Sequence, residues 1–362
     1  MTQTIVLTTG GTGGHIFPAQ SVARELLKKG YQVVFITDNR GQTFQNLPEV
    51  QTYHLVAESV TGRSVFGKIG AFCKLFLGAG QAMRLLAKIK PVLVIGFGGY
   101  ASLPTTISAQ MLNIPTILHE QNAILGRANR VAAWRVKMIA TSFPHVEKVP
   151  NKIPTIHVGQ PVREPILEKQ NTPMPQGDVF NLFIFGGSQG AHFFSTHVSQ
   201  ALMKLPDAYR AKIELTQQAR PEDEADLKQL YANAGFKSLT VASFFKNMPD
   251  LLGQANLIIG RGGAGTLTEA IVVGRPVLVI PLPTAADNHQ AANAKQLEDA
   301  GGGWMVEQKD FDIDKFVTQL QFWMDHPEVL QQAATKAHSL AIVNAAERMA
   351  EMAEDMIKGA KG

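Results

Sequence analysis

A glycine-rich turn that joins a short apolar stretch to a helix-like stretch occurs twice, once in each half of the chain. The first copy is the apolar stretch 5–8 followed by Gly-Gly-Thr-Gly-Gly-His at 10–15, and the second is the stretch 181–185 followed by Gly-Gly-Ser-Gln-Gly-Ala-His at 186–192. Each copy predicts a strand, a phosphate-type loop and a helix. The repeat therefore predicts an α/β protein with two Rossmann-like domains, whose doubly wound parallel sheets face each other across a cleft.

The first glycine loop does not fit the best-known nucleotide motifs. In the dinucleotide-binding pattern that starts at Gly11, the third glycine would be at Ile16, and no Gly-Lys-Ser/Thr follows as in a P-loop. Asp38 lies at the exit of the second predicted strand, where a dinucleotide fold holds a ribose. An oxidoreductase therefore stays open as an alternative.

Two cores fit a chain of 362 residues of which 45% are hydrophobic. Stretches rich in Pro, Gln, Glu and Lys at 150–154 and 160–178 predict a linker. We expect a first domain over residues 1–162, a second over 163–340, and a C-terminal helix within 341–362 that crosses back to the first domain.

The single cysteine, Cys73, excludes a disulfide framework and a cysteine-based zinc site, and it is typical of a reducing compartment. The N-terminus lacks the basic region of a signal peptide and is expected to form a first strand. No apolar run approaches the roughly 20 residues that a membrane-spanning helix needs. We therefore expect no span of a bilayer.

Basic residues are concentrated in one part of the first domain. Residues 59–146 contain ten Lys and Arg against one acid, Glu120, whereas the rest of the chain contains 24 basic and 29 acidic residues. Within this part, 64–89 predicts a basic amphipathic helix that can lie in a membrane interface. The alternative is a crossover helix that packs on the sheet. The predicted membrane face consists of Phe66, Lys68, Phe72, Lys74, Phe76 and Arg84.

In the second half, the stretch 257–290 predicts a clamp for a nucleotide sugar. An apolar strand at 257–259 leads through three glycines to a helix that starts near Ala264 and ends at Gly274. Such a helix start favours a diphosphate or a sugar hydroxyl, and Glu269 suits a ribose diol. The polar run 287–290 follows a second strand. The alternative is a Gly-rich turn with no ligand, followed by a solvated loop.

Two further strand ends in the first half carry candidate site residues. The predicted strand 92–95 leads into Gly-Phe-Gly-Gly-Tyr at 96–100, and the predicted strand 115–118 leads into His-Glu-Gln-Asn at 119–122. Ligands of α/β sheets bind outside the carboxyl ends of the strands. Both loops are therefore candidates, although for His119 we favour a place in the core.

Taken together, these motifs make the chain similar to the GT-B glycosyltransferases of the MurG type over nearly its whole length. Enzymes of this type transfer N-acetylglucosamine from UDP-N-acetylglucosamine (UDP-GlcNAc) to lipid I, which gives lipid II in peptidoglycan synthesis, a process tied to cell-wall biogenesis, cell shape and division. The motifs that carry the resemblance are Gly-Gly-Thr-Gly-Gly-His, Gly-Phe-Gly-Gly-Tyr, His-Glu-Gln-Asn, Gly-Gly-Ser-Gln-Gly and the Arg-Gly-Gly-Ala to Glu269 clamp.

The resemblance implies roles for individual residues. Glu269 would hold the ribose, Ser188 with Arg163 the pyrophosphate, and Phe245 would lie beside the uracil, where the family often has an aliphatic residue. Gln290 with His289 and Asn293 would bind the sugar hydroxyls, although the family commonly has glutamine at position 289. The remaining implied contacts are backbone donors at Ala264, Gly265, Thr266, Leu267 and Thr268, contacts from the first domain at Thr12, Gly13, Gly14 and Asn122, and an acceptor loop at Gly98, Gly99 and Tyr100.

Transfer to the C4 hydroxyl of muramic acid needs a base, and His15 is our candidate because a neutral imidazole suits proton abstraction near pH 7. Glu120 and Asp287 are the alternatives. Helix N-termini and Arg163 can stabilise the departing UDP. No Asp-x-Asp pair lies at a strand end, so we expect no cofactor and no metal bound by the protein, although a free divalent ion can accompany the substrate. The resemblance implies inversion at the sugar.

Two other functions share this architecture: a UDP-sugar 2-epimerase, and a non-catalytic UDP-sugar-binding subunit. For the transferase, the expected partners are UDP-GlcNAc, undecaprenyl-linked lipid I and the anionic inner leaflet of the plasma membrane, on whose cytoplasmic side the protein would be peripheral. Cell-wall synthesis and division proteins are further candidates, and no nucleic acid is expected.

Overall fold

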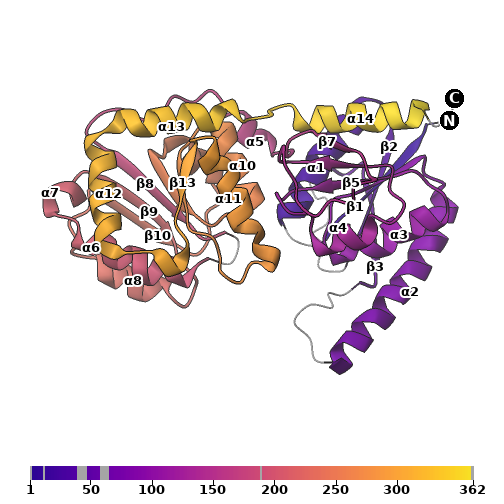
Figure 1. Ribbon diagram of the computed structural model, residues 1–362, viewed down its shortest axis with the longest axis horizontal. Helices are drawn as coiled ribbons and strands as arrows, with labels where there is room; N and C mark the ends of the chain where they lie inside the picture. Colours follow the sequence, from indigo (N-terminus) through magenta and orange to yellow (C-terminus); the bar gives the residue numbers. More distant parts are fainter. Residues whose placement is uncertain (1, 11–12, 39–46, 58–64, 188–189, 360–362) are drawn as a thin grey trace. The chain divides into compact units, whose positions relative to one another are not determined.

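The chain divides into two compact units, each built around one parallel sheet (Figure 1). A computed structural model describes residues 2–10, 13–38, 47–57, 65–187 and 190–359, with the side chains of 65–73 left out. Unit 1 comprises Met1–Arg163 and Ile342–Gly362, and unit 2 comprises Glu164–Ala341. The prediction of two Rossmann-like domains is confirmed.

The sheet of unit 1 has seven parallel strands in the order β3-β2-β1-β4-β5-β6-β7. The strands are β1 (Thr4–Thr8), β2 (Gln32–Asp38), β3 (Gln51–Leu55), β4 (Leu93–Gly96), β5 (Thr116–Glu120), β6 (Met138–Thr141) and β7 (Thr155–His157). The sequence predicted four of them and missed β3, β6 and β7.

Side-chain alternation along the strands of unit 1 supplies two apolar faces, and each is covered by helices. Ile5 and Leu7 of β1 pack in one cluster with α1 (Gly13–Lys28) and α14 (Ala345–Gly359). Val6, which points to the other face, packs with α2 (Val65–Ile89) and α3 (Leu103–Met111). The short helices η1 (Tyr100–Ser102) and α4 (Arg127–Ala132) complete the unit. The C-terminal helix thus belongs to the core of unit 1.

The sheet of unit 2 has six parallel strands in the order β10-β9-β8-β11-β12-β13, a doubly wound arrangement. The strands are β8 (Phe180–Phe185), β9 (Ile213–Gln218), β10 (Ser238–Ala242), β11 (Leu257–Gly260), β12 (Val277–Val279) and β13 (Gly303–Met305), of which β13 was not predicted. Leu182, Ile184, Leu257 and Ile259 form the centre of the larger cluster of this unit.

The helices of unit 2 follow the strands in alternation. They are α5 (Glu164–Leu167), the π-helical turn η2 (Phe194–Val198), α6 (Ser199–Lys204), α7 (Asp207–Arg210), α8 (Glu224–Tyr231), α9 (Met248–Gln254), α10 (Ala264–Val273), η3 (Ala286–Asn288), α11 (His289–Asp299), η4 (Gln308–Asp310), α12 (Ile313–Asp325) and α13 (Pro327–Ser339).

Two local predictions need correction. Strand β5 continues to Glu120, so His119 and Glu120 lie inside the strand and not in the loop after it. The predicted linker 160–178 contains α5. Among the described residues, no helix is long and apolar enough to cross a bilayer.

In both sheets the strand order reverses at the first strand of the unit. In unit 1, β1 lies between β2 and β4, and in unit 2, β8 lies between β9 and β11. In α/β sheets, the loops on the two sides of such a point diverge, and ligands bind outside the carboxyl ends of the strands there. Gly10 and the loop 97–99 flank this point in unit 1, and 186–187, Gly190 and 261–263 flank it in unit 2.

Candidate functional site

The two glycine loops of unit 1 touch each other at the switch point. The amide of Gly10 donates to the carbonyl of Gly98 at 2.9 Å. Gly98 and Gly99 have φ angles of 83° and 78°, in the left-handed region, and a Cβ on Gly99 would lie 2.9 Å from the Cα of Gly10. Only glycine therefore allows this close approach of the loops after β1 and β4.

His15 lies in the first turn of α1, against the second of these loops. Its Nδ1 is 2.9 Å from the carbonyl oxygen of Phe97, and a Cβ on Gly98 would be 3.6 Å from its Cε1. A carbonyl can only accept, so Nδ1 carries the proton and the lone pair of the neutral ring is on Nε2. The fold thus sets the tautomer that a general base requires.

Glu120, an alternative base, is buried and heavily hydrogen-bonded. Its Oε1 accepts from the amide of Asn122 at 2.9 Å and from the Nδ2 of Asn122 at 3.2 Å. Its Oε2 accepts from the amide of Gly126 and from the Nδ2 of Asn129, both at 2.8 Å. The carboxylate therefore holds the loop 121–129 and has little capacity left for a substrate proton.

His119 is a core residue, as we favoured from the sequence. It is fully buried, its Nε2 lies 3.3 Å from the carbonyl of Gly159, and its ring packs on Phe97 with centroids 5.5 Å apart. Burial lowers the pKa of its imidazole to about 4. The ring of His119 is therefore neutral above about pH 4.

In unit 2, the strand-to-helix turn after β11 packs directly on the start of α11. A Cβ on Gly262 would overlap the carbonyl oxygen of Gln290. The carbonyl of Gly262 accepts from the buried Nδ2 of Asn293 at 2.9 Å, and the Oε1 of Gln290 accepts from the amide of Leu282 at 2.9 Å. Gln290 and Asn293, two predicted sugar ligands, are therefore held in fixed places beside the start of α10.

Helix α10 begins at Ala264 and ends at Gly274, as predicted. Gly263 at its N-cap provides no side-chain acceptor for the first-turn amides, and Gly274 adopts a left-handed conformation with a φ of 70°. The amide of Leu267 donates to the carbonyl of Gly263 at 3.0 Å, so of the predicted donors Ala264 to Thr268 the amides of Ala264, Gly265 and Thr266 precede the first intrahelical hydrogen bond. Amides at such a helix start favour an anion or a hydroxyl oxygen. Glu269 is the sixth residue of α10 and is partly exposed.

The polar run that follows β12 contains strained backbone. Asp287 and Asn288 have φ angles of 55° and 57°, in the left-handed region. His289 donates from Nδ1 to the carbonyl of Ala286 at 2.7 Å, because a carbonyl only accepts. Asp287 and His289 are both partly exposed at the beginning of α11.

The structure also places most of the other predicted ligands. Gly13 and Gly14 open α1, Tyr100 opens η1, and Phe245 packs edge-on against Phe183 with centroids 6.1 Å apart. Arg163 belongs to unit 1, where its guanidinium lies 4.6 Å from the ring centroid of Phe17. Thr12 and Ser188 lie outside the described residues.

Sequence reasoning gave no role to two residues that hold these loops. Gln121 donates from Nε2 to the carbonyl of Phe97 at 3.3 Å, beside His15. Arg261 is only 8% exposed and hydrogen-bonds to backbone after β12. The sequence signal for Arg261 was its position, because an arginine that directly follows a buried strand is unusual.

The predicted membrane face is only partly described, because the side chains of Phe66, Lys68 and Phe72 lie outside the description. Of the remainder, Lys74 and Arg84 are exposed, and Phe76 is 76% exposed. The opposite side of α2 packs in the core through Ala82 and Leu86. The crossover interpretation is therefore confirmed for the packed side of α2, and the membrane interpretation of its exposed side stays a prediction.

A second exposed apolar patch lies beside further basic residues of unit 1. Trp134 is 64% exposed, with the guanidinium of Arg135 5.6 Å from its ring centroid. Arg135 also donates to the Oδ1 of Asn113 at 3.1 Å, which brings the end of α3 with its exposed Met111 next to Trp134. The sequence did not single out this patch.

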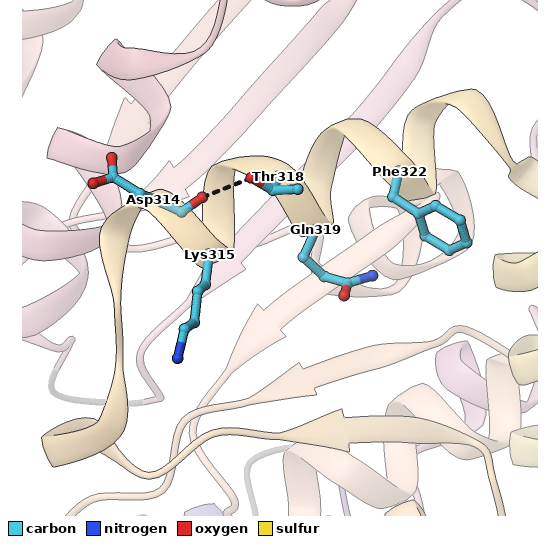
Figure 2. Close-up of a pocket in the computed structure, with 5 residues that line it drawn as sticks. All are labelled: Asp314, Lys315, Thr318, Gln319 and Phe322. Atoms are coloured by element: carbon cyan, nitrogen blue, oxygen red, sulfur yellow. Dashed lines mark hydrogen bonds between the residues drawn. The ribbon is translucent and has the colours of Figure 1, made fainter.

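A hollow over the exposed face of α12 is unrelated to the switch points (Figure 2). Its lining residues are Asp314, Lys315, Thr318, Gln319 and Phe322, none of which lies in a strand-exit loop. Among the described residues, no group of three or more His, Cys, Asp or Glu side chains is placed to hold a metal ion.

The chain matches known proteins in both units. Residues 5–141 match the glycosyltransferase family 28 N-terminal domain, and residues 181–355 match the family 28 C-terminal domain. A UDP-N-acetylglucosamine–N-acetylmuramyl-(pentapeptide) pyrophosphoryl-undecaprenol N-acetylglucosamine transferase of Paramagnetospirillum magneticum is 40% identical, over 99% of this chain and 98% of the relative. The enzyme of the same name from Brucella suis is 42% identical, over 98% and 94%.

Solved structures agree on the GT-B fold. The crystal structure of Acinetobacter baumannii MurG superposes with a TM-score of 0.78 at 28% identity and covers 98% of this chain and 99% of its own. A UDP-GlcNAc 2-epimerase from Neisseria meningitidis shares the fold with a TM-score of 0.67 at 16% identity, over 97% and 100%. The chain therefore belongs to glycosyltransferase family 28 and, within it, to the MurG-type N-acetylglucosamine transferases.

Proposed function

We propose that this protein transfers N-acetylglucosamine from UDP-GlcNAc to the C4 hydroxyl of the muramic acid in lipid I, and so produces lipid II for peptidoglycan. The observation that carries the proposal is the polar cluster of unit 2, where the turn before α10 packs on the fixed pair Gln290 and Asn293 and Glu269 follows in the same helix. Its relatives of more than 39% identity carry this activity in their names.

Unit 2 would bind the donor by complementary polarity. The first-turn amides of α10 are donors, which suits the oxygens of a diphosphate and of the sugar. Glu269 is an acceptor for the ribose hydroxyls, with Phe245 beside the base and His289 near the hexose. Ser188 and Arg163 are the proposed pyrophosphate ligands. The proposal includes no metal ion bound by the protein.

Unit 1 would bind the acceptor and supply the base. The loop of Gly98, Gly99 and Tyr100 is proposed for the acceptor pyrophosphate. The lone pair on the Nε2 of His15 takes the proton of the C4 hydroxyl while that oxygen forms the new bond to C1 of GlcNAc. The bond from C1 to UDP breaks at the same time, and UDP leaves with the electron pair. One displacement inverts the configuration at C1.

Among the three candidate bases, the hydrogen bonds favour His15. The carboxylate of Glu120 accepts four hydrogen bonds from its own loop and would have to release some of them. Asp287 lies in unit 2, on the polar run after β12. In His15, the hydrogen bond from Nδ1 to the backbone carbonyl of Phe97 leaves Nε2 as the nitrogen that can accept a proton.

Two experiments with purified protein test the activity. Labelled UDP-GlcNAc and a short-chain lipid I analogue should give a disaccharide lipid together with UDP. Release of UDP without the disaccharide lipid would favour a UDP-sugar 2-epimerase or a hydrolase function. Binding of UDP-GlcNAc with no turnover of any kind would favour a non-catalytic subunit.

We also propose that unit 1 docks peripherally on the anionic, cytoplasmic leaflet of the plasma membrane. Its exposed Phe76 lies on a helix with exposed Lys74 and Arg84, and Trp134 lies next to Arg135. Apolar side chains rimmed by basic ones are typical of interfacial binding, where each basic residue contributes about 1 kcal/mol. Contacts with cell-wall synthesis and division proteins remain part of the proposal.

Vesicle sedimentation tests the docking surface. Binding to anionic vesicles should weaken when Lys68, Lys74 and Arg84 are changed to glutamate together. A matched control changes three exposed lysines of unit 2 to glutamate, namely Lys212, Lys237 and Lys336. An equal loss in both triple variants would mean that net charge and not this surface drives binding, and no vesicle binding by the wild type would exclude the docking.

A further inference from the structure

A single buried side chain, that of Arg261, ties together three strand exits of unit 2. Arg261 follows β11, and its Nη1 donates to the carbonyls of Ile280 at 2.9 Å and Pro281 at 3.1 Å. Its Nη2 donates to the Oε1 of Gln308 at 3.1 Å. Ile280 and Pro281 follow β12, and Gln308 follows β13. One guanidinium therefore fixes the exits of β11, β12 and β13 relative to one another.

The face of the same guanidinium lies on aromatic rings that follow the glycine loop 186–190. Its central carbon is 4.9 Å from the ring centroid of Phe194 and 5.8 Å from that of Phe193. Phe194 begins the π-helical turn η2, a type of turn that is frequent at functional sites. Arg261 thereby connects the segment after the glycine loop with the loop that follows β12.

The hydrogen bonds of Arg261 lie one residue away from the backbone groups that contact the two proposed sugar ligands, Gln290 and Asn293. Pro281 is held by Arg261, and the next residue, Leu282, donates its amide to the Oε1 of Gln290 at 2.9 Å. On the other side, Gly262 follows Arg261 and accepts from the Nδ2 of Asn293 at 2.9 Å. The backbone groups that hold Gln290 and Asn293 are thus the neighbours of the groups that Arg261 fixes.

The chemistry of the side chain suits this task. Burial lowers the pKa of the Arg261 guanidinium to about 10, so it stays charged at neutral pH. Within the described part of the chain, its hydrogen-bond partners are carbonyl and amide oxygens, and no ion pair to a carboxylate is formed. A planar fork of donors can hold several such oxygens at fixed angles, which a lysine ammonium cannot.

We propose that Arg261 is a positioning residue that sets Gln290 and Asn293 for the hexose of the donor, so that it governs affinity for the sugar part and not for the nucleotide part. The inference rests on the proposed function, in which unit 2 binds a UDP-sugar. It predicts that loss of the Arg261 guanidinium lowers the affinity for UDP-GlcNAc but not the affinity for UDP. A general loss of structure would lower both affinities together.

Calorimetric titration of the full-length protein with UDP-GlcNAc and, separately, with UDP tests this split. In Arg261→Lys, the affinity for UDP-GlcNAc should fall roughly tenfold or more, as expected for lost hydrogen bonds to a charged group, while the affinity for UDP stays as in the wild type. Equal losses for both ligands, or no loss for either, would overturn the inference. A wild type that does not bind UDP-GlcNAc would instead contradict the proposed function.

Two further variants make the result independent of stability. Arg275→Lys is the matched control, because Arg275 is also buried and also donates to backbone carbonyls, but at the end of α10, to Val273, Gly274, Gly253, Thr172 and Pro173. It should lower Tm without separating the two affinities. If Arg261→Lys does not fold, Gln308→Ala removes one of the same contacts and should show the same split, to a smaller extent. A split in Arg275→Lys, or none in Gln308→Ala, would contradict the assignment.

Discussion

The two units share a strand order at their switch points but hold opposite chemistry there. In unit 1, a backbone carbonyl fixes a proton on the Nδ1 of His15 and leaves a lone pair on Nε2, which accepts. In unit 2, the turn after β11 opens a helix with uncapped amides, which donate. The comparison shows that the repeated fold provides the place, whereas the accepting group is a side chain in unit 1 and the donating groups are backbone amides in unit 2.

The buried side chains that hold the loops of the two sites also differ, because one accepts hydrogen bonds and the other donates them. A buried carboxylate, Glu120, gathers the loop after β5 by accepting four hydrogen bonds. A buried cation, Arg261, gathers the loops after β12 and β13 by donating three. Each unit therefore stabilises its loops with a buried charge of the sign that its backbone partners require, amides in unit 1 and carbonyls in unit 2.

The largest expected effect concerns the accepting group of unit 1. His15→Ala should lower kcat by 10²-fold or more, the range for a lost general base, with donor affinity little changed because the proposed donor ligands lie mainly in unit 2. Steady-state kinetics together with UDP-GlcNAc titration measures both quantities. A loss of less than tenfold would point to Glu120 or Asp287 as the base.

A second prediction concerns the buried His119 of unit 1. The pKa of His119 is lowered from 6.5 to about 4 by burial, so between these values the unfolded chain binds a proton that the native state does not. The free energy of unfolding should therefore fall by about 3 kcal/mol as the pH drops from 6.5 to 4 on account of this residue.

Urea unfolding at several pH values measures this term. In His119→Gln, the part of the pH dependence due to this residue should disappear. Parallel curves for the wild type and His119→Gln would show that the imidazole titrates equally in both states.

A third prediction separates two glutamates that occupy comparable positions near the switch points. Glu269→Ala should weaken UDP binding by roughly tenfold, because the ribose hydroxyls lose a charged acceptor, with little change in Tm. Glu120→Ala should lower Tm, because four donors lose their acceptor, and should leave UDP binding unchanged. Calorimetry and thermal unfolding of both variants provide the comparison, and the reverse pattern would exchange the two roles.

The smallest effects concern the glycines themselves. Gly187→Ala in unit 2 should cost roughly 1 kcal/mol, because φ is 87° but no atom lies within 4 Å of the new Cβ. Gly99→Ala in unit 1 should cost more, because its Cβ would also lie 2.9 Å from the Cα of Gly10. Equal losses in denaturant unfolding would mean that the loops of unit 1 can move apart at no cost.

Three of the four strands that the sequence did not predict, β3, β7 and β13, share a physical cause, whereas β6 is an inner strand with three buried residues of four. All three residues of β7 are exposed or partly exposed, and β3 has one buried residue of five. These are the outer strands of the sheet, so they form through backbone pairing with one neighbour and carry no apolar pattern. The central strands β1, β4, β8 and β11 are covered on both faces, and their continuous apolar runs made them visible.

The sequence by itself determined the class of the fold, the number of units and the glycine loops, because apolar periodicity and turn residues act locally. The family followed from the resemblance of its combined motifs to known proteins. Only the tertiary structure decided which nitrogen of His15 carries the proton, that Glu120 holds a loop, and that Arg261 connects three strand exits. These features depend on groups as distant in sequence as Phe97 is from His15 and Gln308 is from Arg261. Hydrogen bonds over such separations exist only once the sheet has brought the strand ends together.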